Sequence, residues 1–528
     1  MNFVRYDSML LKFEDMTTEQ KLGMVFCARR FQPEDVDFII EMLKKRALGC
    51  IQVPYMQPDI IKKLLDAADY PVLCINDTEQ GFTPANLPRA SLASLSACDN
   101  PEYFKSFAKG IAVHAKAAGL NGTWGPVLDI LTVDAPCKVG RCFSSDPEKI
   151  VEKAAIIAQV FKDNGFLSTG KHFPGGTDVG YDTHMAEGVS NLTEEELLKQ
   201  DIYPYIELNK RGLLPCIMTT HTVFKNIDPD YPASLSKKCI DIIRKQGFDG
   251  VAFTDSLAMM GILQKYGEEN AYGLAVSAGN DIVLPNLRTS VKDAFNMFVH
   301  QYELGIITDE RLDEATRRVL KAMEFVAAEP ANPSEFTEQD FENLKNVSRD
   351  CVTAVLDNGV NAKLDGKNED KLFIVITNGP AGDLIEQEIS EKPGWYSPTL
   401  IGKTIEAEFP GAGLGFLPEF PTSGENEKIL TLASNYREVI FMTYCDSPCY
   451  LGTDSMTKRV EAVINCLSLS GKVSTVCHFG SPYALKSISH IKRKIFGYKN
   501  KESQKYAVEV LSGKLEAKGK LPYNVEFQ

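Results

Sequence analysis

The feature that most limits what this chain can fold into is a repeated alternation of short apolar runs with segments of helical periodicity. Near-continuous apolar strands that alternate with helices are typical of a parallel sheet covered by helices. Eight strand–helix units before residue 330 predict a (β/α)8 barrel, with an open doubly wound sheet as the alternative. The eight runs lie at 22–26, 48–53, 71–75, 120–124, 166–169, 215–219, 250–254 and 281–284. Helices are predicted between them, for example over 101–118 and 147–164.

A second, smaller α/β domain follows the barrel. A polar stretch with two prolines after Phe325 ends the first pattern, and a helix is predicted over 337–356. Strands are then predicted at 371–377, 438–444 and 472–479, with a helix at 458–469. The predicted domains are a TIM-type barrel over 1–328, a linker with its helix over 329–370 and an α/β sandwich over 371–528.

Composition and charge exclude several classes of protein. The chain has 528 residues, 44% of them hydrophobic and 24% charged, which is an ordinary globular balance. With 57 Lys and Arg against 71 Asp and Glu its net charge is -14, so we expect no nucleic-acid partner. No run of 18 apolar residues occurs, so we expect no membrane span. The oligomeric state is not predicted.

The cysteines and the N-terminal segment indicate a cytoplasmic protein. Thirteen cysteines without repeated spacing fit reduced, mostly buried thiols. The first residues lack the cleavage site of a signal peptide. Cys445 and Cys449 have no matching second pair, which disfavours a zinc site, and no GxGxxG or P-loop motif occurs. We therefore expect no metal and no cofactor.

Polar and ionisable residues follow five of the apolar runs. Because catalytic groups of a barrel gather at the C-terminal ends of its strands, these positions are candidates for an active site, although any one of them could simply cap a strand or begin a loop. They are Asp77 and Glu79, Asp129, Lys171 and His172, His221, and Asp255.

The segment 171–184, KHFPGGTDVGYDTH, carries the most specific signal. It places Lys171 and His172 at a strand end, followed by a glycine-rich loop that contains Asp182 and His184. A mobile loop of this kind could deliver a proton donor to a substrate, and an aspartate beside a histidine orients the imidazole. A metal site at Asp178, Asp182 and His184 is disfavoured because no other Cys/His cluster accompanies it. At the seventh run, Asp255 could be a nucleophile, a base or a helix cap.

These motifs together resemble glycoside hydrolase family 3, in its β-N-acetylhexosaminidase branch. The resemblance spans almost the whole chain, but two loops depart from the branch pattern: Gly176-Thr177 replaces His-Gly, and Gln80 replaces a glycine. The matching motifs are Lys171–Gly175 with Asp182–His184, Phe253–Met259 for F-S-D-x-L-x-M, Arg141–Pro147 for R-x-F-x-x-D-P, Asp77–Gly81 for D-x-E-G-G, and the closing segments Val510–Lys514 and Gly519–Pro522.

The resemblance implies a retaining hydrolase that removes terminal β-linked N-acetylglucosamine. Asp255 is implied as the nucleophile, with His184 and Asp182 as the acid/base pair. Residues implied to hold the sugar are Asp77, Arg141, Lys171 and His172. His221 is a further candidate from its position at a strand end, either as a pocket wall that contacts substrate or as a packed supporting residue.

Several alternatives remain open at this stage. Arg141 could instead pair with Asp146, Asp129 more naturally supports the barrel mouth, and Trp124 more naturally packs in the core. Phosphorolysis by the same acid/base pair, β-glucosidase activity and a catalytically inactive sugar-binding protein are the alternative functions. The natural aglycone and the role of the second domain are not predicted.

Overall fold

The computed structural model describes residues 11–133, 135, 138, 140–378, 394–446, 449–450 and 456–527. The chain forms two compact units, and each unit combines segments that are separated in the sequence. Unit 1 comprises Met1–Leu87, Phe104–Ile130 and Asp146–Phe341, and unit 2 comprises Pro88–Tyr103, Leu131–Ser145 and Glu342–Gln528.

Unit 1 is a closed barrel of eight parallel strands. Four strands pair in the order β1-β2-β3-β4 and four in the order β10-β9-β7-β5. Bridges Phe26–Val283 and Gly122–Leu167 join the two sheets at both edges and close the ring. The strands are β1 (Cys27–Ala28), β2 (Cys50–Gln52), β3 (Leu73–Asn76), β4 (Gly122–Thr123), β5 (Thr169–Phe173), β7 (Cys216–Thr219), β9 (Val251–Ser256) and β10 (Ile282–Leu284). The predicted barrel is confirmed, and the open doubly wound sheet is excluded for this unit.

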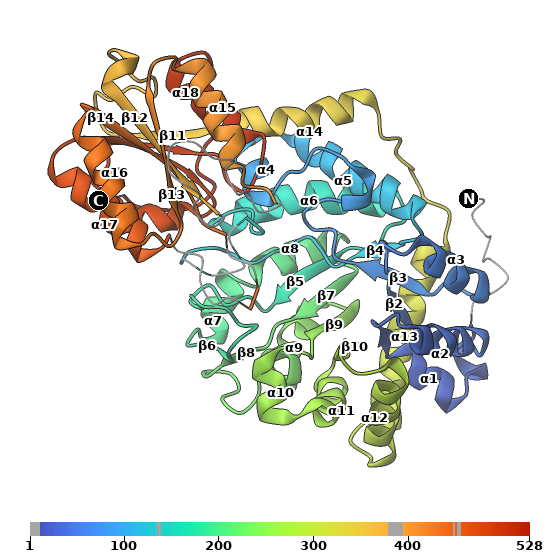
Figure 1. The fold of residues 1–528 in the computed structure, drawn as a ribbon. Helices are drawn as coiled ribbons and strands as arrows, with labels where there is room; N and C mark the ends of the chain where they lie inside the picture. Colours follow the sequence, from blue (N-terminus) through green and yellow to red (C-terminus); the bar gives the residue numbers. More distant parts are fainter. Residues whose placement is uncertain are drawn as a thin grey trace. The chain divides into compact units, whose positions relative to one another are not determined.

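Helices cover the outside of the barrel strands (Figure 1). Local signals fix where they begin: at α6, for example, the Asp146 side chain accepts the Glu148 N–H at 2.9 Å, and Pro147 occupies the first position. The helices are α1 (Thr18–Met24), α2 (Pro33–Lys44), α3 (Pro58–Ala67), α5 (Pro101–Ala117), α6 (Pro147–Asp163), α7 (Glu194–Lys199), α8 (Tyr203–Lys210), α9 (Lys237–Lys245), α10 (Met260–Tyr266), α11 (Glu268–Ala278), α12 (Val291–Glu303) and α13 (Asp309–Ala327).

Two barrel strands lie further along the chain than the apolar runs indicated. The run 22–26 falls largely in α1, which a capping box between Thr17 and Gln20 begins, and β1 follows it. The run 166–169 precedes most of β5, because β5 continues through the polar Lys171 and His172 toward the barrel mouth. A short parallel pair, β6 (Gly188–Ser190) with β8 (Thr222–Phe224), was not predicted.

Unit 2 is a six-stranded sheet between two layers of helices. Its order is β11-β16-β15-β14-β12-β13, parallel except for β11. Helices α15 and α18 lie on one face and α16 and α17 on the other (Figure 1). The elements are α4 (Leu92–Cys98), β11 (Thr353–Leu356), β12 (Lys371–Thr377), α15 (Pro398–Glu408), β13 (Gly413–Pro418), α16 (Ser423–Ser434), β14 (Glu438–Tyr444), α17 (Lys458–Leu469), β15 (Val473–Phe479), β16 (Arg493–Phe496) and α18 (Ser503–Ser512).

The helix predicted over 337–356 is too long. Helix α14 (Glu338–Asp350) ends earlier, and the segment TAVL that follows is strand β11, paired antiparallel with β16. Its β-branched residues and its pairing partner favour the extended conformation over the last helical turn.

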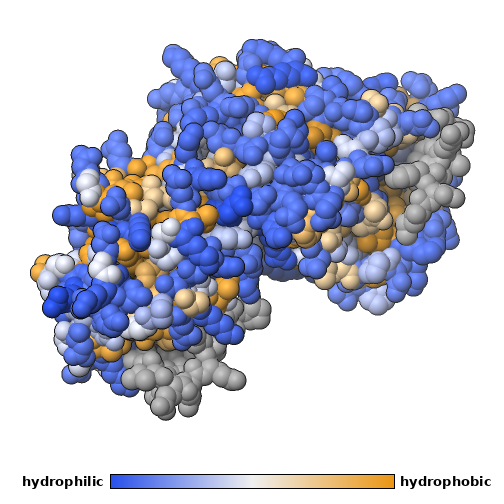
Figure 2. Space-filling view, turned by 90° about the horizontal axis from the view of Figure 1, so that it is seen from above, coloured by the Kyte–Doolittle hydropathy of each residue, from blue (hydrophilic) through white to orange (hydrophobic). Residues whose placement is uncertain are grey.

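On the face seen in Figure 2, hydrophilic residues predominate and hydrophobic ones lie between them in small groups. Among the residues that the structure describes, none of the helices has the length and apolar composition that a membrane crossing requires.

Candidate active site

The sequence-predicted residues of unit 1 lie at the C-terminal ends of barrel strands. Asp77 follows β3, Lys171 and His172 belong to β5, and Asp255 is near the end of β9. Since β5, β7 and β9 are neighbours and parallel, their carboxyl ends open on the same mouth.

Lys171 is held between two carboxylates at the barrel mouth. Its ammonium is 2.7 Å from Asp77 Oδ1 and 2.6 Å from Glu79 Oε2, and its side chain is only 2% exposed. Asp77 is 55% exposed, so one partner of the buried ammonium reaches the solvent. The arrangement offers fixed donors and acceptors of the kind that recognise sugar hydroxyls.

His172 is oriented by Asp129. The imidazole Nδ1 lies 2.7 Å from Asp129 Oδ2, and the His172 N–H donates to Asp129 Oδ1 at 3.1 Å. Nε2 of the same ring is 3.9 Å from Asp255 Oδ2. Asp129 is buried and therefore supports His172 from below, as its sequence position indicated.

Asp255 is an ionised carboxylate in a histidine-lined environment. Burial opposes its ionisation, but electrostatic interactions with His172, His221 and His184 outweigh burial and, together with the Ser256 N–H, hold the pKa of Asp255 well below its usual range. The Ser256 N–H donates to Oδ1 at 2.6 Å. With its side chain still 21% exposed, Asp255 combines a permanent negative charge with access from the barrel mouth.

Asp182 and His184 form a hydrogen-bonded pair on the loop after β5. His184 Nδ1 lies 2.8 Å from Asp182 Oδ1, and the His184 N–H donates to the same oxygen at 2.9 Å. The Asp182 side chain is 1% exposed and that of His184 is 21% exposed. When Nδ1 donates to the carboxylate, exchange of a proton with a substrate takes place at Nε2.

The beginning of this loop is fixed by Asp201. Its Oδ1 accepts the N–H groups of Gly176 and Thr177 at 2.8 and 3.0 Å, and its Oδ2 accepts the Thr177 hydroxyl at 3.2 Å. Gly175 has a φ of 105° and a Cβ there would lie 2.5 Å from Asp201 Oδ1, so only glycine fits. At Gly175, therefore, the glycine is needed for a tight turn, whether or not the loop moves.

The remaining predicted residues have different roles: His221 is a supporting residue, Trp124 packs in the core, and Arg141 belongs to unit 2. His221 is buried, with Nδ1 at 2.7 Å from Ser234 Oγ and Nε2 at 3.0 Å from the Ser256 carbonyl, and burial lowers its pKa. It therefore supports the backbone beside Asp255. Trp124 is 1% exposed and packs edge-on against Phe253, as expected of a core residue. Arg141 lies in the segment Leu131–Ser145 of unit 2, so its role as a sugar ligand stays a prediction.

Arg29 was not predicted as a site residue, and Glu79 was predicted only as a strand-end candidate without a partner. Arg29 directly follows β1, and its guanidinium donates to Ser256 Oγ and Gln52 Oε1, both at 2.8 Å. It thus braces the residue next to Asp255. Its position at the end of an apolar run was the available signal. The first strand was predicted at 22–26, however, and so Arg29 was not recognised as a strand-end residue.

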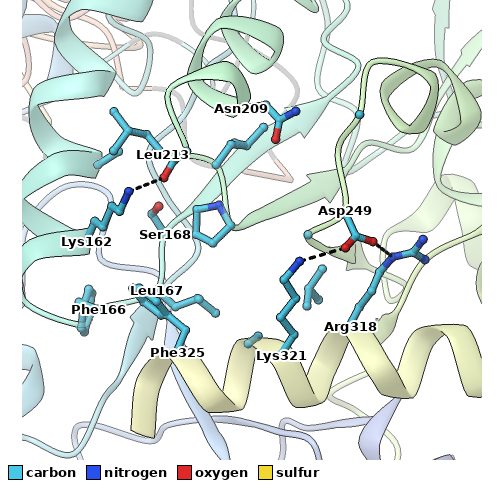
Figure 3. Close-up of a pocket in the computed structure, with 18 residues that line it drawn as sticks. Lys162, Phe166, Leu167, Ser168, Asn209, Leu213, Asp249, Arg318, Lys321 and Phe325 are labelled. Atoms are coloured by element: carbon cyan, nitrogen blue, oxygen red, sulfur yellow. Dashed lines mark hydrogen bonds and ion pairs between the residues drawn. The ribbon is translucent and has the colours of Figure 1, made fainter. Parts of the chain in front are cut away.

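The candidate site is separate from the cavity at the other end of the barrel, and the described residues form no metal-binding cluster. Among the described residues, no three or more His, Cys, Asp or Glu side chains are grouped to hold a metal ion. A cavity of about 380 Å3 lies at the N-terminal ends of β5, β7 and β9, opposite the catalytic mouth. Figure 3 shows Phe325, Leu213 and the Arg318–Asp249–Lys321 ion pairs around it.

Comparison with known proteins agrees with this geometry. A β-hexosaminidase of Tolumonas auensis is 29% identical over 233 residues, covering 43% of this chain and 69% of that relative. The structure of a family 3 β-N-acetylglucosaminidase from Paenibacillus sp. str. FPU-7 superposes with a TM-score of 0.78 at 22% identity, covering 97% of this chain and 100% of the other. A β-glucoside phosphorylase has a TM-score of 0.77 at 20% identity, covering 97% and 95%.

The family model of the glycosyl hydrolase family 3 N-terminal domain matches residues 41–322, more than half of the chain and most of its barrel. The confirmed barrel, the carboxylate at the end of β9 and this match lead to one conclusion: the chain belongs to glycosyl hydrolase family 3 and is a glycosidase.

Proposed function

We propose that the protein is a retaining β-N-acetylhexosaminidase that releases terminal β-linked N-acetylglucosamine, with Asp255 as nucleophile and His184 as acid/base. The observation that carries the proposal is the geometry at the barrel mouth, where Asp255 is 21% exposed near the end of β9 and the hydrogen-bonded Asp182–His184 pair lies on the loop after β5. The lowered pKa of Asp255 supports it. A carboxylate that stays ionised and partly exposed at a barrel mouth is suited to attack an anomeric carbon.

The two residues divide the chemistry between them. In the first step an Asp255 oxygen bonds to the anomeric carbon while the glycosidic C–O bond breaks, and protonated His184 gives the Nε2 proton to the leaving oxygen. In the second step neutral His184 takes a proton from water, which displaces Asp255 from the anomeric carbon. Two inversions give net retention, and the buried Asp182 keeps the imidazole in one tautomer through both steps.

The sugar is held, in this proposal, by the groups around Lys171. Asp77, Lys171 and His172 present a carboxylate, an ammonium and an imidazole within the mouth. A site built to hydrogen-bond hydroxyls discriminates strongly against sugars that lack or invert them. The choice of N-acetylglucosamine rests on the named activities of the β-hexosaminidase relative and the β-N-acetylglucosaminidase neighbour.

A panel of aryl β-glycosides tests the substrate and the acceptor together. The 4-nitrophenyl N-acetylglucosaminide, glucoside and N-acetylgalactosaminide are turned over in phosphate and in a non-phosphate buffer, and the products are followed by NMR. We expect the N-acetylglucosaminide to be cleaved fastest, at equal rates in both buffers, with the β-anomer of the free sugar formed first.

Variants separate the active-site chemistry from general damage. Asp255→Asn should abolish turnover, whereas His300→Ala, an exposed histidine of α12 paired with Glu269, should leave it unchanged. N-acetylglucosamine 1-phosphate as the main product would establish phosphorolysis instead. Faster cleavage of the plain glucoside would overturn the substrate assignment.

A further inference from the structure

The acid loop, residues 174–187, is docked on the helix that follows the nucleophile strand. Strand β9 ends just after Asp255, and α10 begins at Met260 (Figure 1). The Met260 N–H donates to the His184 carbonyl at 3.1 Å. A backbone bond therefore ties the acid/base residue directly to the segment that carries the nucleophile.

Gly261 sets the distance between the loop and the helix. A Cβ at this position would lie 3.1 Å from both the Cα and the N of Glu187 and 3.3 Å from the carbonyl carbon of Ala186. All three neighbouring atoms are backbone, so no side-chain rotation relieves the contact. Any larger residue at position 261 must move the acid loop away from α10.

A second contact lies one turn further along the helix. Lys265 Nζ is 2.9 Å from Glu187 Oε1, and this interaction raises the pKa of Lys265. The pair is partly exposed, so it contributes less than the backbone contact at Gly261. The two contacts bracket the end of the loop from the same helix.

We propose that α10 fixes the position of the acid loop by direct contact and that Gly261 is a positioning residue. Gly261 sets how closely His184 approaches the substrate held by Asp255. This inference rests on the proposed roles of His184 and Asp255. Gly261 touches neither substrate nor reacting atoms. It acts through the Ala186–Glu187 backbone, with Lys265 as a weaker second contact.

The variants Gly261→Ala and Gly261→Val test the proposal with graded bulk. Alanine requires the loop to move by a few tenths of an ångström, and valine requires more. Since misplacement by about 1 Å can cost about 100-fold in rate, we expect kcat/KM for a substrate with a poor leaving group to fall about 10-fold with alanine and about 100-fold with valine. For a dinitrophenyl glycoside, which needs no protonation, kcat/KM should change less than about 3-fold.

Azide provides a second readout that a purely structural defect would not produce. Hydrolysis of the glycosyl-enzyme needs His184 as base, so kcat for the dinitrophenyl substrate should fall in Gly261→Val even though kcat/KM hardly changes. Azide attacks the glycosyl-enzyme without base assistance, so it should restore this kcat and yield the glycosyl azide. Gly424→Ala is the matched control, because Gly424 lies in helix α16 and a Cβ added there would meet no atom within 4 Å. Lys265→Gln should show the same leaving-group dependence, about 3-fold, whereas Lys237→Gln on α9 should not.

The outcomes distinguish this inference from the proposed function. The assay uses whichever aryl glycoside the wild type cleaves, so a different sugar specificity would leave the test intact. Equal losses of kcat/KM for substrates with good and poor leaving groups would overturn the proposed role of α10 and Gly261. No loss of kcat/KM with either Gly261 variant would overturn it as well. If Gly261→Val does not fold, Gly261→Ala and Lys265→Gln decide. A wild-type protein that cleaves no glycoside would overturn both proposals.

Discussion

Replacing Asp201 by alanine and by asparagine should affect the protein to very different extents. Asp201 is 2% exposed and accepts three hydrogen bonds from Gly176 and Thr177 at the start of the acid loop. Alanine removes all three and leaves two buried N–H groups without this acceptor. Asparagine retains an oxygen for both N–H groups, and its amide nitrogen can donate to the Thr177 hydroxyl.

The magnitudes follow from the cost of unsatisfied buried donors. At about 1–3 kcal/mol for each of the two buried N–H groups, Asp201→Ala should lower the free energy of unfolding by about 2–6 kcal/mol. That corresponds to a decrease in Tm of roughly 3–9 °C for a unit of about 300 residues, at about 2.1 cal/mol/K of unfolding entropy per residue. Asp201→Asn loses only the charge of the acceptor and should cost about 1 kcal/mol.

Calorimetry and kinetics measure the two consequences separately. Asp201→Ala should also reduce kcat/KM for a poor leaving group more than for a dinitrophenyl glycoside, because Asp182 and His184 lie on the same loop. Asp241→Ala is the control, because Asp241 is a partly exposed carboxylate on α9 whose surface ion pair with Lys237 is worth little, and it should change stability by less than about 0.5 kcal/mol. Equal destabilisation by alanine and asparagine would refute this reasoning.

Three further predictions concern charge. Lys171→Met leaves Asp77 and Glu79 side by side without their ammonium, so urea unfolding should detect a loss of about 3 kcal/mol, and kcat/KM should fall at least about 10-fold. Burial lowers the pKa of His478 to about 3, so the folded state resists its protonation. Its contribution to stability is complete above about pH 7.5 and should fall by about 2 kcal/mol between pH 7.5 and 5, because the unfolded histidine has a pKa of about 6.5. His478→Phe should remove this loss in pH-dependent unfolding experiments. Because the pKa of Asp255 is lowered, the nucleophile stays charged in weak acid, and kcat/KM for a dinitrophenyl glycoside should show no Asp255 titration between pH 7 and 5.

The barrel was predictable because buried parallel strands leave apolar runs at regular intervals. The prediction failed where polar residues belong to a strand, as Lys171 and His172 do in β5, and where a capping box at Thr17 converts an apolar run into a helix. Strand β11 was missed for a related reason. Its pairing partner β16 lies far along the chain, and periodicity within one segment carries no information about such a partner.

The candidate site was predictable as far as strand ends and motifs reach. The pairing of Asp182 with His184 followed from their closeness in the sequence, and the strand position of Asp129 indicated a supporting role at the barrel mouth, although not its contact with His172. The contacts made by Arg29, Glu79, Asp201 and Gly261 did not, because each joins segments that only the closed barrel brings together. A glycine in a short helix, in particular, gives no sign in the sequence of the backbone that approaches it.

The most direct test of the central claim is to trap the glycosyl-enzyme and identify the residue that carries the sugar. A 5-fluoro derivative of N-acetylglucosaminyl fluoride, which forms the intermediate faster than it hydrolyses, is incubated with the full chain, and the digest is analysed by tandem mass spectrometry. We predict one added fluorosugar on the peptide that contains Asp255, and none in Asp255→Asn. A label on another residue, or rapid turnover without any covalent adduct, as when the substrate's own acetamido group is the nucleophile, would contradict the assignment of Asp255.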